Sequence, residues 1–489
     1  MLLSQGSIKG KHGAIYPLLQ NLINRKRKGL FYKTACSISA SAAPYTHALR
    51  SSSHPDASKR TKSSSAFYRP HRIWPPRRSA AAAAAAMGLE MEEMAASIGV
   101  SVPVLRFLLC FAATIPTGLL WRAVPGATGR HLYAGLTGAA LSCLSFGATS
   151  NLLFVAPMAL GYLAMLLFRR HAGLITFLGA FGFLIACHAY YMSGDAWKEG
   201  GIDATGALMV LTLKVISCAI NYSDGILKEE GLREAQKKYR LTKLPSLIEY
   251  FGYCLCCGSH FAGPVYEMKD YLDWTERKGI WASSTPSPLL PTLRAIVQAE
   301  AAIIISGLGF TGWSESSPPK AKWDRAKNVD VLGVELAGSA VQLPLMWNIQ
   351  VSTWLRYYVY ERLIQKGKKP GFLQLLGTQT VSAIWHGLYP GYIIFFVQSA
   401  LMINGSRVIY RWQQAVSNSV LRSILAFLNF AYTLLVLNYS CIGFQVLSFK
   451  ETLASYQSVY YVGTIVPIVC LLLGNVIKPA RKPKAQKAE

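Results

Sequence analysis

Long apolar segments recur from residue 103 to residue 477, and they limit the possible folds of this chain more than any other feature. Of its 489 residues, 52% are hydrophobic and only 15% are charged, against about 25% charged in typical soluble domains. A membrane span needs about 20 mostly apolar residues, and every backbone polar group in lipid must be hydrogen-bonded internally. No segment alternates like a barrel strand. The pattern therefore predicts an all-α polytopic membrane protein with about 11 transmembrane or re-entrant helices: 103–121, 131–148, 149–168, 172–192, 205–222, 246–263, 294–312, 331–349, 372–398, 422–447 and 455–477.

The first 86 residues differ from everything that follows. They hold fifteen Lys and Arg residues and one acid, Asp56, so they carry a net +14 of the chain's +26. They are rich in Ser and end in the run Ala80–Ala86, a composition typical of organelle transit peptides. The alternative is an upstream start codon, with Met87 as the working start. In either case we expect residues 1–86 to form no packed structure, followed by a membrane domain at 87–480 and a basic tail at 481–489.

The remaining basic residues lie mostly in loops, where they indicate orientation rather than nucleic-acid binding. Lys and Arg are concentrated in the loops 226–244 and 366–369 and in the tail, whereas the loop 194–203 is acidic. Cytoplasmic loops carry an excess of Lys and Arg. We therefore expect the basic loops and the C-terminus in the cytosol.

Several ionisable groups fall inside the apolar segments, where such groups are costly and usually face a polar interior. Arg106 lies near a segment end and can reach the interface. Lys214, Glu300 and Glu335 are either internal ion pairs or substrate contacts. The cysteines at 254, 256 and 257 form the only cluster of thiols, and a metal site would need further ligands. We predict that they pack in the core and that the chain holds no metal.

His386 stands out because the helix around it is broken. Apolar residues precede it, and Gly387, Pro390 and Gly391 follow within five positions. A broken helix at membrane depth is tolerated where it lines a cavity. A neutral imidazole there can accept a proton from a hydroxyl as a general base. The alternative for His386 is a histidine that only packs.

A second polar feature lies 38 residues upstream. Residues 347–362 read as one helix, on which Asn348, Ser352 and Arg356 recur every four residues. Asn348 could donate a hydrogen bond to a developing oxyanion, or join two helices by a hydrogen bond.

At these two stretches the sequence resembles the membrane-bound O-acyltransferase family, in its lysophospholipid acyltransferase branch and most of all the plant members. The resemblance runs from about Met87, where the residues Met91–Val102 are similar to the family's usual start. Its specific part is the ordered pair of blocks around Asn348 and His386. The matching residues are Trp347–Gln350, Trp354–Arg356, Tyr360–Arg362, Ser382–Gly387 and Tyr389–Tyr392, with weaker agreement at Asp224–Gly225, Phe261–Pro264, Lys269–Tyr271 and Asn328–Glu335.

The resemblance implies a multi-helix fold around an intramembrane chamber, with His386 as catalytic base and Asn348 as its partner. The reaction would move a fatty acyl chain from acyl-CoA to the sn-2 hydroxyl of a lysophospholipid, with lysophosphatidylcholine expected first, in phospholipid remodelling at the endoplasmic reticulum. No cofactor is expected besides acyl-CoA as co-substrate. Neighbouring polar and aromatic side chains are candidate substrate contacts: Trp385, Arg356, Tyr357, Tyr360, Ser352 and Tyr389.

Two other functions fit parts of the sequence. The same family could act on another acceptor, such as a sterol, a diacylglycerol or a protein. A polytopic transporter would also contain many spans with intramembrane Lys and Glu. Against the transporter stand the absence of a visible repeat and the paired Asn348 and His386 blocks. The sequence leaves the oligomeric state, the acyl-chain preference and organelle targeting by residues 1–86 open.

Overall fold

The computed structural model describes residues 80–192, 204–296, 300–365, 368 and 371–477. The chain divides into two compact units, 1–83 and 84–489, and the second contains nearly all the described residues. The acidic loop 194–203, most of the leader and the tail 481–489 lie outside the described residues. The described helix α2 (Ala80–Ser97) begins inside the predicted leader, because a run of alanines has the highest helix propensity.

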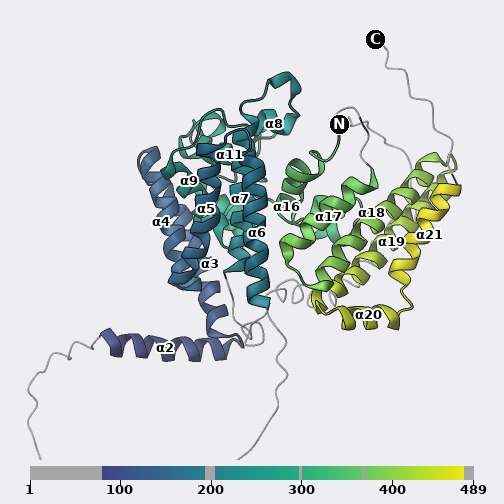
Figure 1. The fold of residues 1–489 in the computed structure, drawn as a ribbon, viewed down its shortest axis with the longest axis horizontal. Helices are drawn as coiled ribbons and strands as arrows, with labels where there is room; N and C mark the ends of the chain where they lie inside the picture. The colour runs from purple at the N-terminus through teal and green to yellow at the C-terminus, as the bar shows by residue number, and fades with distance from the viewer. Residues whose placement is uncertain (1–79, 193–203, 297–299, 366–367, 369–370, 478–489) are drawn as a thin grey trace, which may run out of the picture. The chain divides into compact units, whose positions relative to one another are not determined.

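Five long helices follow α2, and their bounds agree with the first five apolar segments to within four residues (Figure 1). Glycines with positive φ separate some of them: Gly147 (φ 89°) ends one helix and begins the next. This backbone region is open to glycine without a steric penalty. The helices are α3 (Val102–Trp121), α4 (Ala127–Phe146), α5 (Ala148–Leu167), α6 (Ala172–Met192) and α7 (Thr205–Asp224).

The middle of the chain consists of short elements instead of the spans predicted at 246–263, 294–312 and 331–349. Helix α9 starts at a capping box, in which Ser246 and Glu249 exchange side-chain and backbone hydrogen bonds (2.7 and 3.3 Å). The elements are η3 (Glu229–Gly231), α8 (Glu234–Tyr239), α9 (Leu247–Leu255), α10 (Cys257–His260), α11 (Met268–Thr275), η4 (Gly279–Trp281), α12 (Leu289–Arg294), α13 (Ala301–Ser306), β1 (Gly312–Trp313), β2 (Ala321–Lys322), α14 (Val331–Glu335), α15 (Leu343–Met346) and α16 (Ile349–Leu355). The two strands pair antiparallel.

Long helices return in the last quarter of the chain. The predicted segment 372–398 is divided at Gly387 (φ 132°), and Pro390 starts the next helix, where its missing N–H is no loss. The last segment is bent by 74° between two helices. The elements are a π-helical turn, η5 (Arg356–Tyr360), and then α17 (Phe372–His386), α18 (Pro390–Ala415), α19 (Ser419–Val446), α20 (Phe449–Ser458) and α21 (Val462–Val476).

Six described helices are long and apolar enough to cross a membrane, or seven if the bent pair α20–α21 is one span. The six are α3, α5, α6, α7, α18 and α19. The all-α polytopic fold is therefore confirmed, whereas the count of about 11 is not. Most of the difference lies in the segments 246–263, 294–312 and 331–349, where polar, Gly and Pro residues leave helices that are too short to span the hydrocarbon layer. The predicted segment 131–148 forms the 20-residue helix α4, which is not among the six.

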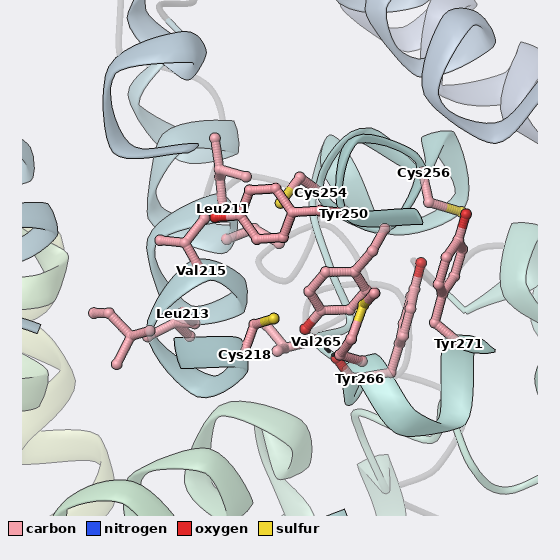
Figure 2. Close-up of a cluster of buried hydrophobic side chains, with 14 of the residues drawn as sticks. Leu211, Leu213, Val215, Cys218, Tyr250, Cys254, Cys256, Val265, Tyr266 and Tyr271 are labelled. Atoms are coloured by element: carbon pink, nitrogen blue, oxygen red, sulfur yellow. Dashed lines mark hydrogen bonds between the residues drawn. The ribbon is translucent and has the colours of Figure 1, made fainter. Parts of the chain in front are cut away.

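Helix α7 is the most deeply buried of the six, with 83% of its apolar window inside the protein. Figure 2 shows why: Leu211, Val215 and Cys218 of α7 meet a layer of tyrosines and cysteines contributed by residues 250–271. Burial of apolar surface contributes about 25 cal/mol per Å², so this layer stabilises the packing of α7 against residues 250–271. Cys254 and Cys256 belong to the same buried cluster, as predicted for packing residues.

Candidate active site

Two tryptophans attach the segments with the predicted catalytic residues to successive turns of α7. The indole Nε1 of Trp354, on α16, donates a hydrogen bond to the carbonyl of Leu213 (3.0 Å). The indole Nε1 of Trp385, on α17, donates to the carbonyl of Met209 (3.0 Å), one turn earlier. Both indoles are buried. Because the acceptors are four residues apart on one rigid helix, α7 sets the spacing between the Asn348 segment and the His386 segment.

Asn348 lies immediately before α16, in the left-handed region of the backbone (φ 47°, ψ 47°). This conformation costs most L-residues about 1–2 kcal/mol, and Asn is one of the few that adopt it. The first N–H groups of α16 are satisfied from elsewhere: Asn328 accepts from Ile349 through its carbonyl (2.9 Å) and from Gln350 through its side chain (3.1 Å). The Asn348 side chain is therefore not required to cap the helix.

The predicted single helix 347–362 is divided after Leu355, where α16 continues as the π-helical turn η5. A π-turn places an extra residue in the helix, so the stripe of Asn348, Ser352 and Arg356 does not continue beyond Arg356. Such turns occur often at functional sites. Here the turn directs Tyr358 inward and leaves Arg356 exposed.

A buried hydrogen-bonded triad holds this π-turn. The Tyr358 hydroxyl donates to a carboxylate oxygen of Glu267 (2.7 Å). The Asn221 amide, on α7, donates to the same oxygen (2.9 Å) and to the Tyr358 hydroxyl (2.8 Å). Burial raises the pKa of Glu267 to about 7, against hydrogen bonds from Tyr358 and Asn221 that lower it. Next to the triad, Arg362 forms a bidentate pair with Asp224 at the end of α7 (2.6 and 3.2 Å).

Glu267→Gln is expected to flatten the pH dependence of stability. The pKa of Glu267 is raised above its ordinary value, so the folded state binds more protons than the unfolded state, and stability falls as pH rises from about 4.5 towards 7. At about 1.4 kcal/mol per pKa unit, the loss is about 3 kcal/mol. Glutamine keeps the hydrogen-bonding oxygen without this titration. Melting temperatures in detergent at pH 5 and pH 8 should therefore differ less for Glu267→Gln than for wild type. The exposed Glu230→Gln is the control, and equal pH dependence in all three proteins would contradict the expectation.

His386 is the last residue of α17 and is half-buried among aromatic rings. Phe396 stacks on its imidazole with centroids 4.8 Å apart. Phe444 meets the imidazole edge-on at 5.4 Å, and Tyr392 lies at 5.7 Å. These rings come from α18 and α19. They restrict the rotamer of His386 and give the imidazole the apolar surroundings that the sequence predicted.

A pocket of about 580 Å³ opens beside the π-turn. Three of the predicted substrate contacts line it: Arg356, Tyr357 and Tyr360. Arg233, which precedes α8, and Glu234, its first residue, also line the pocket, together with Glu361. The Arg356 guanidinium is paired with Glu361 (2.9 Å), and Arg233 donates to the carbonyl of Ile364 (2.7 Å). The pocket thus offers two anchored arginines and two phenol rings to a ligand.

The sequence model of the membrane-bound O-acyltransferase family (MBOAT) matches residues 189–300 and 294–448. These two matches include both blocks that carry Asn348 and His386, and together they cover more than half of the chain. The chain belongs to the membrane-bound O-acyltransferase family. It is therefore an acyltransferase, as the paired blocks predicted, and the transporter interpretation falls away.

Individual relatives agree with this acyltransferase assignment. The chain is 61% identical over 463 positions to lysophospholipid acyltransferase 1 of Arabidopsis thaliana, covering 82% of this chain and 100% of the relative. It is 60% identical to lysophospholipid acyltransferase 2 of the same plant, covering 82% of this chain and 99% of the relative. Human lysophospholipid acyltransferase 5 is 25% identical over 82% of this chain and 94% of its own length.

This acyltransferase is shorter than its plant relatives inside the aligned region. The alignment with the first relative has 463 positions, but 82% of 489 residues is only about 400, so about 60 positions have no counterpart here. The two matched parts of the family meet at residues 294–300, between α12 and α13. These helices have six residues each. We expect the shortening at this junction.

The remaining predicted contacts have structural roles or stay untested. The Trp385 indole is occupied by the Met209 carbonyl. Tyr389 is half-buried, with its ring centroid 5.7 Å from that of Tyr392. Ser352 is half-buried on α16. None of these three lines the pocket beside the π-turn.

The internal ion pairs offered for Lys214, Glu300 and Glu335 are not formed among the described residues. The Lys214 ammonium donates to Ser259 Oγ (2.9 Å) and to the carbonyl of Cys254 (3.3 Å), between the rings of Tyr253 and Tyr266. The carboxylate of Glu300 accepts from backbone N–H groups at 328 and 329. Glu335 is exposed at the end of α14. Aromatic faces and backbone dipoles replace the counter-charge that the sequence suggested.

Sequence reasoning missed Glu267, Tyr358, Arg233 and His188. The first two belong to the triad, Arg233 lines the pocket, and His188 of α6 contacts the backbone next to His386. The available signals were the cost of a polar group in or near an apolar segment and, for Arg233, its place in a basic loop. Neither signal identifies the residue's contact partner.

Proposed function

We propose that this acyltransferase moves a fatty acyl chain from acyl-CoA to the free hydroxyl of a lysophospholipid, with lysophosphatidylcholine as the first acceptor. The observation that carries the proposal is the attachment of the Asn348 and His386 segments to adjacent turns of α7 by Trp354 and Trp385, in a chain about 60% identical to two proteins named lysophospholipid acyltransferases.

In the proposed reaction His386 removes the proton from the acceptor hydroxyl while its oxygen attacks the thioester carbonyl. The Asn348 amide donates a hydrogen bond to the oxyanion that develops on that carbonyl. When the carbon–sulfur bond breaks, the imidazolium returns the proton to the departing CoA thiolate. The products are a phospholipid and free CoA. A thioester is already activated, so the proposal requires no metal and no cofactor.

We assign the pocket beside the π-turn to the nucleotide end of acyl-CoA. Arginines suit phosphate groups, and a base can stack on the phenol rings of Tyr357 and Tyr360. Tyr360→Ala is expected to raise the KM for acyl-CoA about tenfold, since stacking on one base contributes about 1–3 kcal/mol, while kcat changes little. Initial rates in microsomes at varied acyl-CoA measure this. The exposed Arg170→Gln is the control, and an unchanged KM in Tyr360→Ala would refute the assignment.

We propose a multi-pass protein of the endoplasmic reticulum membrane with a cytosolic C-terminus. The lysines at 366–369 and the basic tail should share the cytosolic face. In sealed microsomes, protease should therefore remove tags placed at both positions together, and protection of one tag alone would contradict the proposal.

A chain beginning at Met87 should keep insertion and acyl transfer, since residues 1–86 are proposed to lie outside the membrane domain. Plastid or mitochondrial accumulation of a fluorescent fusion of residues 1–86 would argue for targeting.

The function is tested directly by labelled acyl-CoA in microsomes that contain the chain, with a panel of lysophospholipids, a sterol and a diacylglycerol as acceptors. Incorporation into phosphatidylcholine is the expected result. The same assay is made with a lengthened variant, in which the positions that this chain lacks relative to the Arabidopsis protein are inserted at residues 294–300. If only the lengthened variant transfers acyl chains, the shortening at residues 294–300 is the cause of the inactivity of the chain without the added positions. If neither transfers acyl chains to any lysophospholipid, the proposed acceptor is wrong.

A further inference from the structure

The carbonyls in the last turn of a helix have no partner within the helix and must find one elsewhere. Helix α17 ends at His386, and Gly387 turns the chain away. The N–H of Gly387 satisfies the carbonyls of Ala383 and Ile384 (both 3.2 Å). The next carbonyl, that of Trp385, belongs to the peptide group that connects directly to His386.

That carbonyl meets the imidazole of His188, which lies on α6. The distance from His188 Nε2 to the Trp385 carbonyl oxygen is 3.2 Å, and both residues are buried, at 7% and 6% exposure. A carbonyl oxygen can only accept, so the proton must be on Nε2 of His188. The contact joins residues 197 positions apart in the chain.

We propose that His188 is a positioning residue for His386. It holds the Trp385–His386 peptide group from α6, while the Trp385 indole holds the same residue from α7 through the Met209 carbonyl. The aromatic rings of α18 and α19 pack against the imidazole of His386. Because both the peptide group and the ring of His386 are held, its basic nitrogen keeps one position in the site. This inference rests on the proposed catalytic role of His386.

Loss of the hydrogen bond is expected to reduce turnover rather than substrate binding. A displacement of about 1 Å at a reacting group can cost about 10²-fold in rate. His188→Leu should therefore lower kcat by about 10–100-fold, with the KM for acyl-CoA within about threefold of wild type. His188→Gln carries an N–H donor at a similar reach and should keep most of kcat. Glutamine cannot be protonated, so recovery by Gln assigns the effect to hydrogen bonding and not to proton transfer.

The experiment measures kcat and KM in microsomes for wild type, His188→Leu, His188→Gln and His386→Ala, at matched protein levels. Thr176→Val is the control, because Thr176 is also buried on α6 and its hydroxyl has no hydrogen-bond partner among the described residues. Thr176→Val should leave kcat unchanged. A wild-type kcat in His188→Leu would overturn the inference, as would a His188→Gln protein as slow as the Leu variant. If His188→Leu does not accumulate, kcat of His188→Gln is compared with kcat of His188→Asn, because Asn is too short to reach the carbonyl. A faster Gln variant supports the inference, and equal rates overturn it. Near-normal activity of His386→Ala would instead overturn the proposed catalytic role.

Discussion

His386→Ala is expected to reduce acyl transfer by about 10²–10⁴-fold, which is the usual contribution of a general acid–base group. The reduction should appear in kcat, since the substitution removes the proposed base and leaves the rings of Phe396 and Phe444 in place. Insertion and protein level should be normal, because alanine is readily accommodated at the end of a helix. Labelled acyl-CoA and lysophosphatidylcholine in microsomes measure the rate.

His171→Ala is the matched control for this substitution. His171 lies in the turn between α5 and α6 and is exposed, so its removal takes away an imidazole without touching the site. We expect wild-type rates from it. Near-normal acyl transfer by His386→Ala at a normal protein level would show that this histidine only packs.

Asn348→Ala is expected to lower kcat by about 10²–10³-fold if its amide stabilises the oxyanion. The backbone conformation at this position complicates the experiment, because φ of Asn348 is 47° and alanine is strained there. Asn348→Gly removes the same amide without the strain. Comparing kcat of the two variants therefore separates the effect of losing the side-chain amide from the effect of backbone strain.

Both variants should be slow if the amide acts on the substrate. An active Asn348→Gly beside an inactive Asn348→Ala would assign Asn348 to backbone geometry alone. The double variant His386→Ala/Asn348→Gly should be little slower than His386→Ala, because residues that act as a unit are not additive in rate. Additive losses would indicate that the two side chains act separately.

The long helices could be predicted from sequence because their signal is local. Helices α3, α5, α6 and α7 start and end within two residues of the predicted segments, since about 20 apolar residues bounded by Gly, Pro or polar residues are sufficient in lipid. The middle of the chain was predicted poorly. Segments 246–263 and 294–312 are apolar but divide into helices of four to nine residues, because polar and Gly residues interrupt them. Helices α9 and α10 pack against α7, whereas α13 packs against α3.

The candidate site was likewise predicted only in part. Arg356, Tyr357 and Tyr360 were predicted as substrate contacts on one helix, and they do line one pocket. Arg233 of the same pocket comes from 123 residues earlier, where the sequence showed only a basic loop. Charge patterning indicated the side of the membrane but not the pocket.

The sequence by itself determined the membrane class, the main helices and the two blocks that carry Asn348 and His386, because apolar length and short motifs are properties of neighbouring residues. Tertiary structure alone decided how those blocks are held. Trp354 and Trp385 reach carbonyls of α7 that are 141 and 176 residues away, and His188 reaches across 197. Each of these contacts joins a side chain to a backbone carbonyl. Every residue has such a carbonyl, so the acceptor leaves no mark in the sequence, and only the packing of α6, α7, α16 and α17 selects it.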